Sequence, residues 1–156
     1  MSSRARPALA LVGFLAVSFL PSVAGAFATP GAWYAQLDKP AWNPPAWLFG
    51  PVWTALYATI GVAGWLVWRR VGFAGASAAW VAFAAQLVLN ALWSPLFFGL
   101  QRPGLALGGI VALWVAIVAT VATFWRHDRV AGGLLLPYLG WVSFATALNF
   151  ALWRMN

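Results

Sequence analysis

The chain has 156 residues, of which 63% are hydrophobic and only 7% are charged, and its mean hydropathy is +0.83. A soluble domain carries about a quarter charged residues, so this composition excludes a soluble protein and predicts a polytopic membrane protein. The formal net charge of +7 does not indicate a nucleic-acid partner, because the arginines are scattered singly and in pairs along the chain. The absence of cysteine excludes disulfides, thiolate catalysis and cysteine-ligated metals.

Five charge-free stretches divide the chain: 8–28, 45–68, 77–100, 103–125 and 131–153. Each has about 20 residues or slightly more, the length that a helix needs to cross a hydrocarbon core of about 30 Å. None alternates like a barrel strand, so backbone pairing in lipid requires helices. We therefore predict an all-α integral membrane fold, a five-transmembrane-helix bundle that forms a single domain over residues 1–156.

The first stretch has two interpretations. Arg4 and Arg6 precede an apolar run, and Ala24-Gly25-Ala26 resembles a signal-peptidase site. The run is longer than the usual signal-peptide core of about 7–15 residues, which favours a retained first helix. One face of this helix carries small residues suited to close helix packing: Ser18, Ser22 and Gly25.

The segment 33–57, which forms the loop between helices 1 and 2 and the start of helix 2, is rich in tryptophan and proline and contains the chain's only lysine, Lys39. Pro40 and the pair Pro44-Pro45 remove backbone donors and favour extended geometry before them, so no helix runs through the loop. A proline-stiffened wall of flat rings can bind something flat. The alternative is an interfacial belt of tryptophans beside a stiff loop, and the segment alone leaves both open.

Polar side chains occur within two of the later stretches. Gln86, Asn90 and Trp93 share one stripe of 77–100, and Tyr138 and Trp141 give 131–153 a similar face. Buried amides in a bilayer cost free energy unless they are paired, so these faces should point into the bundle. We expect Pro95 to kink its helix near the end, and we interpret 103–125, where Gly104 and Gly108 are spaced for close packing, as scaffold.

The distribution of basic residues predicts an orientation. Six lysines and arginines lie on the side of the N-terminus, and three lie on the side of the first loop. The positive-inside rule then predicts the N-terminus inside and the tryptophan-rich loop outside.

Three segments together match one pattern: WYxxLxKPxWxPPxW(x)FxPVWxxLY at Trp33–Tyr57, AAQLxxNxxWxPxFF at Ala84–Phe98 and PYLxWxxxAxxLNF at Pro137–Phe150. In this order and spacing, and over nearly the whole chain, the sequence resembles the TspO/MBR family. These are the tryptophan-rich sensory proteins and the translocator proteins, or peripheral-type benzodiazepine receptors.

The resemblance implies a membrane bundle, commonly a homodimer, that binds porphyrins such as protoporphyrin IX and acts in tetrapyrrole homeostasis and stress sensing. It implies a pocket capped by the first loop and lined by Tyr34, Pro44, Phe49, Trp53, Asn90, Trp93, Trp141, Ala145 and Leu148. Trp53 and Trp141 match the tryptophans implicated in light-dependent porphyrin breakdown, which makes them the candidate catalytic residues. Some members also bind sterols, but here Phe150 replaces the tyrosine of the sterol-recognition pattern, which argues against specific sterol binding.

The residues themselves suit such a ligand. Stacked indoles fit a flat apolar macrocycle, and Asn90, Trp53 Nε1–H and Tyr138 are candidate hydrogen-bonding groups that would orient it. On the loop side, Lys39, Arg102 and Arg154 are each either a solvated helix end or the partner of a porphyrin propionate.

Other chemistry finds no support in the sequence. Asp38 and Asp128 lie in loops on opposite membrane faces and cannot form a hydrolytic carboxylate pair. The sole histidine, His127, is predicted on the face opposite the pocket, so we expect no metal site and no required cofactor, with free-base porphyrin as ligand.

Two alternatives to porphyrin binding as the function remain open. One is facilitated transport of porphyrins or other amphipathic molecules, since no acidic residue lies in a span to run a proton-coupled relay. The other is a regulatory membrane partner without catalysis. The pair Ala78 and Ala82, spaced for close helix approach, is the candidate contact of a homodimer.

Overall fold

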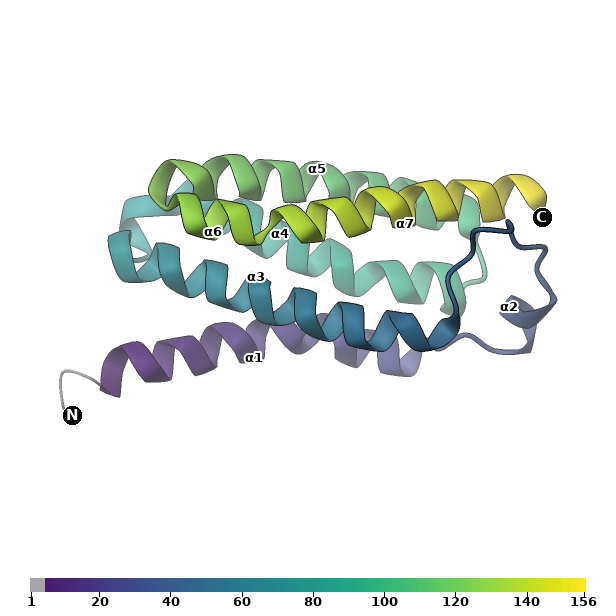
Figure 1. Ribbon diagram of the computed structural model, residues 1–156, viewed down its shortest axis with the longest axis horizontal. Coiled ribbons are helices and arrows are strands. Elements are labelled where there is room, and N and C mark those ends of the chain that lie inside the picture. Colours follow the sequence, from purple (N-terminus) through teal and green to yellow (C-terminus); the bar gives the residue numbers. More distant parts are fainter. Residues whose placement is uncertain (1–4) are drawn as a thin grey trace.

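The computed structural model describes residues 5–156; residues 1–4, which include Arg4 of the charge count, lie outside the described residues. Within this range five helical units are long and apolar enough to cross a membrane: Arg6–Phe27, Ala46–Val71, Ala74–Gly99, Pro103–His127 and Arg129–Met155. They lie side by side in an elongated bundle (Figure 1). This confirms the predicted all-α integral membrane fold.

The two ends of the bundle differ (Figure 1). One end holds the long first loop, with the short helix α2 (Ala32–Gln36), and the C-terminus of the chain. The other end holds the start of α1 (Ala5–Phe27), the turn after α3 (Phe49–Val71) and the junction between α5 (Pro103–His127) and α6 (Arg129–Leu134).

The second span starts later as an α-helix than the sequence predicts. Pro45 is extended, with φ −63° and ψ 142°, and a 3-10 turn at Ala46–Leu48 precedes the first residue of α3, Phe49. The helix continues past the predicted end at residue 68 and stops at Gly72, whose φ of +65° favours glycine.

The fifth span is broken into two helices, α6 and α7 (Leu136–Met155), where the sequence predicts a single helix over 131–153. The break falls at Leu135, and Pro137 lies in the first turn of α7, where its missing N–H costs nothing. Asp128 caps α6 by accepting hydrogen bonds from the backbone N–H groups of Val130 and Ala131, at 2.8 and 3.0 Å. Its carboxylate also pairs with Arg70 of α3, with 2.6 Å between Nε and Oδ2.

Pro95 follows α4 (Ser77–Ser94) and starts a π-helical turn, Pro95–Gly99, that continues the third span. A proline inside a helix removes one hydrogen bond and crowds the carbonyl one turn earlier, and a wider turn relieves both problems. The backbone N–H of Leu100 donates to the carbonyl of Pro95 at 2.8 Å.

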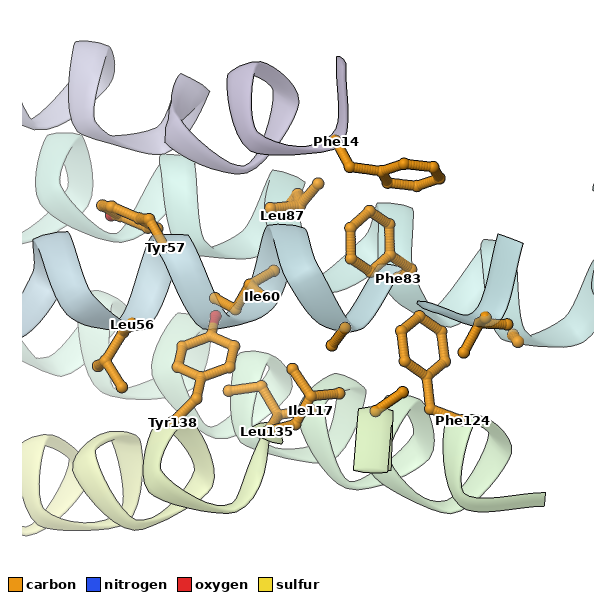
Figure 2. Packing of buried hydrophobic residues seen from close by; sticks show 14 of the residues in the cluster. Phe14, Leu56, Tyr57, Ile60, Phe83, Leu87, Ile117, Phe124, Leu135 and Tyr138 are labelled. Atoms are coloured by element: carbon orange, nitrogen blue, oxygen red, sulfur yellow. The ribbon is translucent and has the colours of Figure 1, made fainter. Parts of the chain in front are cut away.

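A buried aromatic cluster forms part of the core away from the first loop. Three phenylalanine rings follow one another across the bundle (Figure 2): Phe14 of α1, Phe83 of α4 and Phe124 of α5. The rings of Phe83 and Phe124 stack with centroids 5.7 Å apart. In α5, Gly104 packs against Trp153, whereas Gly108 has no neighbour within 4 Å of a built Cβ. The predicted pair of packing glycines is therefore half correct.

Candidate functional site

A cavity of two adjoining chambers lies at the loop end of the bundle. The outer chamber, under the first loop, has a volume of about 640 Å³, and the inner chamber, between the helices, has about 410 Å³. These volumes lie within the range of about 300–1,000 Å³ that is typical of small-molecule sites. The chambers share one stretch of wall, made by Gly25, Phe49, Trp53, Trp93, Ser94 and Ala145.

Each of the nine residues predicted to bind ligand lines at least one of the two chambers. Tyr34, Pro44 and Leu148 line the outer chamber, and Asn90 and Trp141 line the inner one. The other four line both: Phe49, Trp53, Trp93 and Ala145. Residues from the first loop and from α3, α4 and α7 thus converge on one space, and their role in binding stays a prediction.

The loop forms the roof of the outer chamber. The Tyr34 ring packs edge-on against Phe97 and Phe98, with centroids 6.2 and 5.4 Å away, and its hydroxyl donates to Oδ1 of Asn43 at 3.4 Å. Burial raises the pKa of the Tyr34 hydroxyl above its ordinary value, and the hydrogen bond to Asn43 opposes part of this rise. The phenol therefore stays neutral near pH 7.

The sequence left open whether the tryptophans of segment 33–57 form a ligand-binding wall or an interfacial belt, and their positions differ in the structure. Trp53, at the start of α3, lines the cavity, as a ligand-binding wall requires. Trp42 and Trp47 are 49% and 71% exposed, as in an interfacial belt. The structure therefore places one tryptophan of the segment at the cavity and two at the surface, and ligand binding by the segment stays a prediction.

A buried chain of hydrogen bonds begins at Tyr57 and Asn90 in the wall of the inner chamber and joins three helices. Tyr57 of α3 donates to Oδ1 of Asn90 at 3.1 Å, and Nδ2 of Asn90 donates to the Tyr138 hydroxyl at 2.7 Å. The Tyr138 hydroxyl donates in turn to Oε1 of Gln86 at 2.9 Å. Tyr138 is fully buried and lines neither chamber, so it is not the orienting group that the sequence suggested.

Aromatic contacts hold the tryptophans of the wall in place. Trp93 donates its Nε1–H to Oδ1 of Asn149 at 3.0 Å, which fixes the plane of its indole. Trp53 stacks on Tyr57, with centroids 5.3 Å apart, and Phe49 meets Trp141 edge-on at 5.7 Å. Among the described residues the buried Nε1–H of Trp141 has no hydrogen-bond partner, which is a cost that protein interiors rarely carry.

Some wall residues were not named from the sequence. Leu152 lies one helical turn after Leu148 in α7, so the helical period could have identified it. Asn43 lies in the irregular loop and has no periodic signal. His127 lies at the far end of the bundle, in the wall of a separate cavity of about 200 Å³, as its predicted position requires.

The fold and the cavity define a class: an integral, multi-pass helical membrane protein with an aromatic cavity between its helices and under a proline-rich loop. Comparison with known proteins gives the family. Residues 8–154 match the TspO/MBR family, and the chain belongs to it.

Curated relatives match over most of their length. The tryptophan-rich protein TspO of Archaeoglobus fulgidus is 46% identical over 149 residues, covering 94% of each chain. The tryptophan-rich sensory protein of Cereibacter sphaeroides is 41% identical over 92% of this chain and 89% of its own. The human translocator protein is 40% identical over 80% of this chain and 75% of its own.

Proposed function

We propose that the chain binds a flat, largely apolar tetrapyrrole, such as protoporphyrin IX, in the two-chamber cavity and acts in porphyrin homeostasis or stress sensing. The observation that carries the proposal is the aromatic stretch of wall common to both chambers, with Phe49, Trp53 and Trp93. Membership of the TspO/MBR family, and relatives named as sensory proteins and translocators, support a sensory or transport role in the membrane.

The energetics agree with such a ligand. Burying about 300 Å² of apolar macrocycle at roughly 25 cal/mol per Å² contributes about 7 kcal/mol before the entropic cost of binding. Among residues 5–156, no histidine or methionine lines either chamber, and His127 lies at the opposite end. The proposed ligand is therefore a free-base porphyrin rather than an axially ligated haem.

Light-dependent breakdown of the bound porphyrin is part of the proposal, because Trp53 and Trp141 both line the inner chamber. An indole in contact with a light-excited macrocycle can donate one electron, which leaves an indole radical cation and a porphyrin radical anion. Dissolved dioxygen is the oxidant: it adds to the porphyrin radical anion, and the new carbon–oxygen bond gives a peroxide anion, which takes up the proton that the indole radical cation loses from its Nε1–H. The two tryptophans are the proposed electron donors.

Titration of the purified protein with protoporphyrin IX, followed by tryptophan fluorescence, tests the proposal. We expect saturable quenching at micromolar ligand. In the double variant Trp53→Phe, Trp141→Phe we expect weaker but measurable binding and loss of the light-dependent decay of porphyrin absorbance. The matched control is Trp114→Phe, Trp125→Phe, which changes two partly exposed tryptophans of α5 that line neither chamber.

Two results would contradict the proposal. Quenching that rises linearly with ligand would mean partition into detergent or lipid without a site. Unchanged light-dependent decay in the cavity double variant would show that the two tryptophans are not the electron donors.

Facilitated transport is the second candidate function. Ser22, Thr29 and Gly50 are exposed and line the inner chamber, so the cavity opens at its side. Measuring porphyrin flux across vesicles distinguishes transport from binding alone.

A further inference from the structure

Within the described part of the chain, Lys39 carries the one formal charge in the wall of the cavity. Among residues 5–156, no other lysine or arginine and no aspartate or glutamate lines either chamber. Arg102 and Arg154 lie at the same end of the bundle but line neither chamber. The sequence offered three equal candidates for contact with a propionate, and the structure places only one of them, Lys39, in the wall of the cavity.

The Lys39 ammonium is held at the edge of the outer chamber. Its Nζ donates to the carbonyls of Leu37 and Ala35, at 3.0 and 3.3 Å, and lies 4.8 Å from the centroid of the Tyr34 ring. An aromatic face and carbonyl oxygens both stabilise a cation. These contacts use two of the three ammonium donors, so one donor is left for a ligand.

The backbone next to Lys39 is fixed as well. Asn156, beyond the end of α7, accepts from the N–H of Asp38 at 2.9 Å and donates to its carbonyl at 3.0 Å. Figure 1 shows the loop passing close to the C-terminus of the chain. The lysine therefore extends from an anchored segment, which reduces the entropy lost when a ligand binds to it.

Among residues 5–156, no carboxylate forms an ion pair with this ammonium. Within the part of the chain that the structure describes, the one ion pair joins Arg70 and Asp128, and these residues lie at the opposite end of the bundle. A half-buried cation above an otherwise uncharged aromatic cavity is complementary to an amphipathic molecule with an apolar body and an acidic edge.

We propose that Lys39 is the carboxylate-recognising residue of the cavity, and that it makes the cavity prefer ligands with a carboxylate at one edge over esters and neutral molecules of the same shape. The inference rests on the proposed function and names the ligand group that the wall selects. The macrocycle body lies against Phe49, Trp53 and Trp93, and the propionate edge meets the Lys39 ammonium.

A comparison of an acid with its ester tests this inference. Protoporphyrin IX and its dimethyl ester share the macrocycle and differ in charge at one edge. Dissociation constants are measured by tryptophan quenching in the same nanodiscs, and each variant is compared with the unchanged protein for each ligand, so differences in lipid partition cancel. The variants are Lys39→Met, which keeps the length and apolar stem, Lys39→Arg, which keeps the charge, and Arg102→Met as the off-wall control.

We expect Lys39→Met to weaken binding of the acid about tenfold, as for loss of one charge-assisted hydrogen bond at a partly exposed site. Binding of the ester should change less than about twofold, since the ester has no charge for Lys39 to meet. Lys39→Arg should restore most of the acid's affinity, and Arg102→Met should leave both ligands unchanged. In the unchanged protein, added salt should weaken binding of the acid more than binding of the ester.

Equal weakening of acid and ester by Lys39→Met would show that the side chain only packs the loop, and would overturn the inference while the proposed function stands. An unchanged affinity for both ligands would overturn it in the same way. Absence of saturable quenching by either ligand in the unchanged protein would overturn the proposed function, and this inference with it.

Discussion

At the scale of single residues, the buried amides and phenols act first as connectors between helices. Asn90 uses its oxygen for Tyr57 and one N–H for Tyr138, so most of its hydrogen-bonding capacity is committed before a ligand arrives. The chain of bonds ends at Gln86, whose Nε2 is buried without a partner among the described residues. In a bilayer such hydrogen bonds stabilise the fold, because the hydrocarbon core has no water to pair with a polar group that lacks a partner.

Removing one phenol from this chain should have a measurable cost. Tyr138→Phe deletes the hydroxyl that both accepts from Asn90 and donates to Gln86. Interhelical hydrogen bonds in membranes contribute about 0.6 kcal/mol on average, so we expect a loss of about 1–2 kcal/mol in the free energy of unfolding. Tyr57→Phe, which breaks a single bond, should cost about half as much. Denaturation in mixed micelles measures both.

Thr123→Val is the control for this series, because the Thr123 hydroxyl bonds only to carbonyls of its own helix. Its effect should stay within about 0.5 kcal/mol. Equal costs for the two tyrosine variants would contradict the idea that Tyr138 is the shared link of the network.

At the scale of elements, glycines decide how closely α1 approaches α3. A Cβ built on Gly61 would lie 2.9 Å from Cδ2 and 3.0 Å from Cα of Leu15, and one on Gly64 would lie 2.8 Å from the Phe14 ring. Backbone atoms cannot move aside as a side-chain tip does, so the contact at Gly61 depends on the absence of a side chain. The close packing expected for the small residues of α1 is thus made mainly by glycines of the helix facing it.

Gly61→Ala should therefore destabilise the bundle. We expect a loss of about 1–3 kcal/mol, typical of overpacking in a filled core, measured as the free energy of unfolding in micelles. Gly140→Ala in α7 is the matched control: it is also in a helix, and nothing lies within 4 Å of its built Cβ. That change should be neutral or stabilising by up to about 1 kcal/mol through helix propensity. A neutral Gly61→Ala would show that α1 can move away from α3 without cost.

At the scale of the whole molecule, the two ends have different roles. The end with the first loop holds both chambers, whereas the other end holds the stacked Phe83 and Phe124 rings, the smaller cavity beside His127 and the Arg70–Asp128 pair. Five of the described basic residues gather at this other end: Arg6, Arg69, Arg70, Arg126 and Arg129. The positive-inside rule predicts that this end faces the inside and that the cavity end faces outward.

Single-cysteine labelling tests this orientation cleanly, because the natural chain has no cysteine. Gln36→Cys places a thiol on the exposed surface of α2, and Arg129→Cys places one at the exposed start of α6. With a membrane-impermeant maleimide on intact cells, we expect labelling at position 36 and none at position 129 until the membrane is opened. The reverse pattern would overturn the predicted topology. Arg129 is chosen over its neighbour because Asp128 is buried and caps a helix.

Much of the fold could be predicted from local properties of the chain. The five spans follow from the length and lack of charge of five stretches, and the loop follows from Pro40, Pro44 and Pro45. The break at Leu135 and the π-helical turn at Pro95 could not be predicted, because a proline only disfavours a regular helix and the neighbours choose how the chain responds.

The candidate site divides in the same way. Its aromatic and amide residues were found as stripes on single helices, since a helical period is visible in sequence. The hydrogen-bond partners of these residues could not be found from the sequence. Tyr138 was expected to face a ligand and instead lies fully buried between Asn90 and Gln86. The anchoring of the loop by Asn156, which lies 118 residues away from Asp38, also has no local signal.

The sequence alone therefore determined that this chain crosses the membrane five times and carries a loop rich in tryptophan and proline between its first two spans, because hydropathy and proline chemistry act over a few neighbouring residues. Only the tertiary structure decided which polar atoms satisfy one another and which face the cavity. That choice depends on ångström distances between helices far apart in the chain, and it is why Lys39, among three basic residues on that side, is the one that lines the cavity.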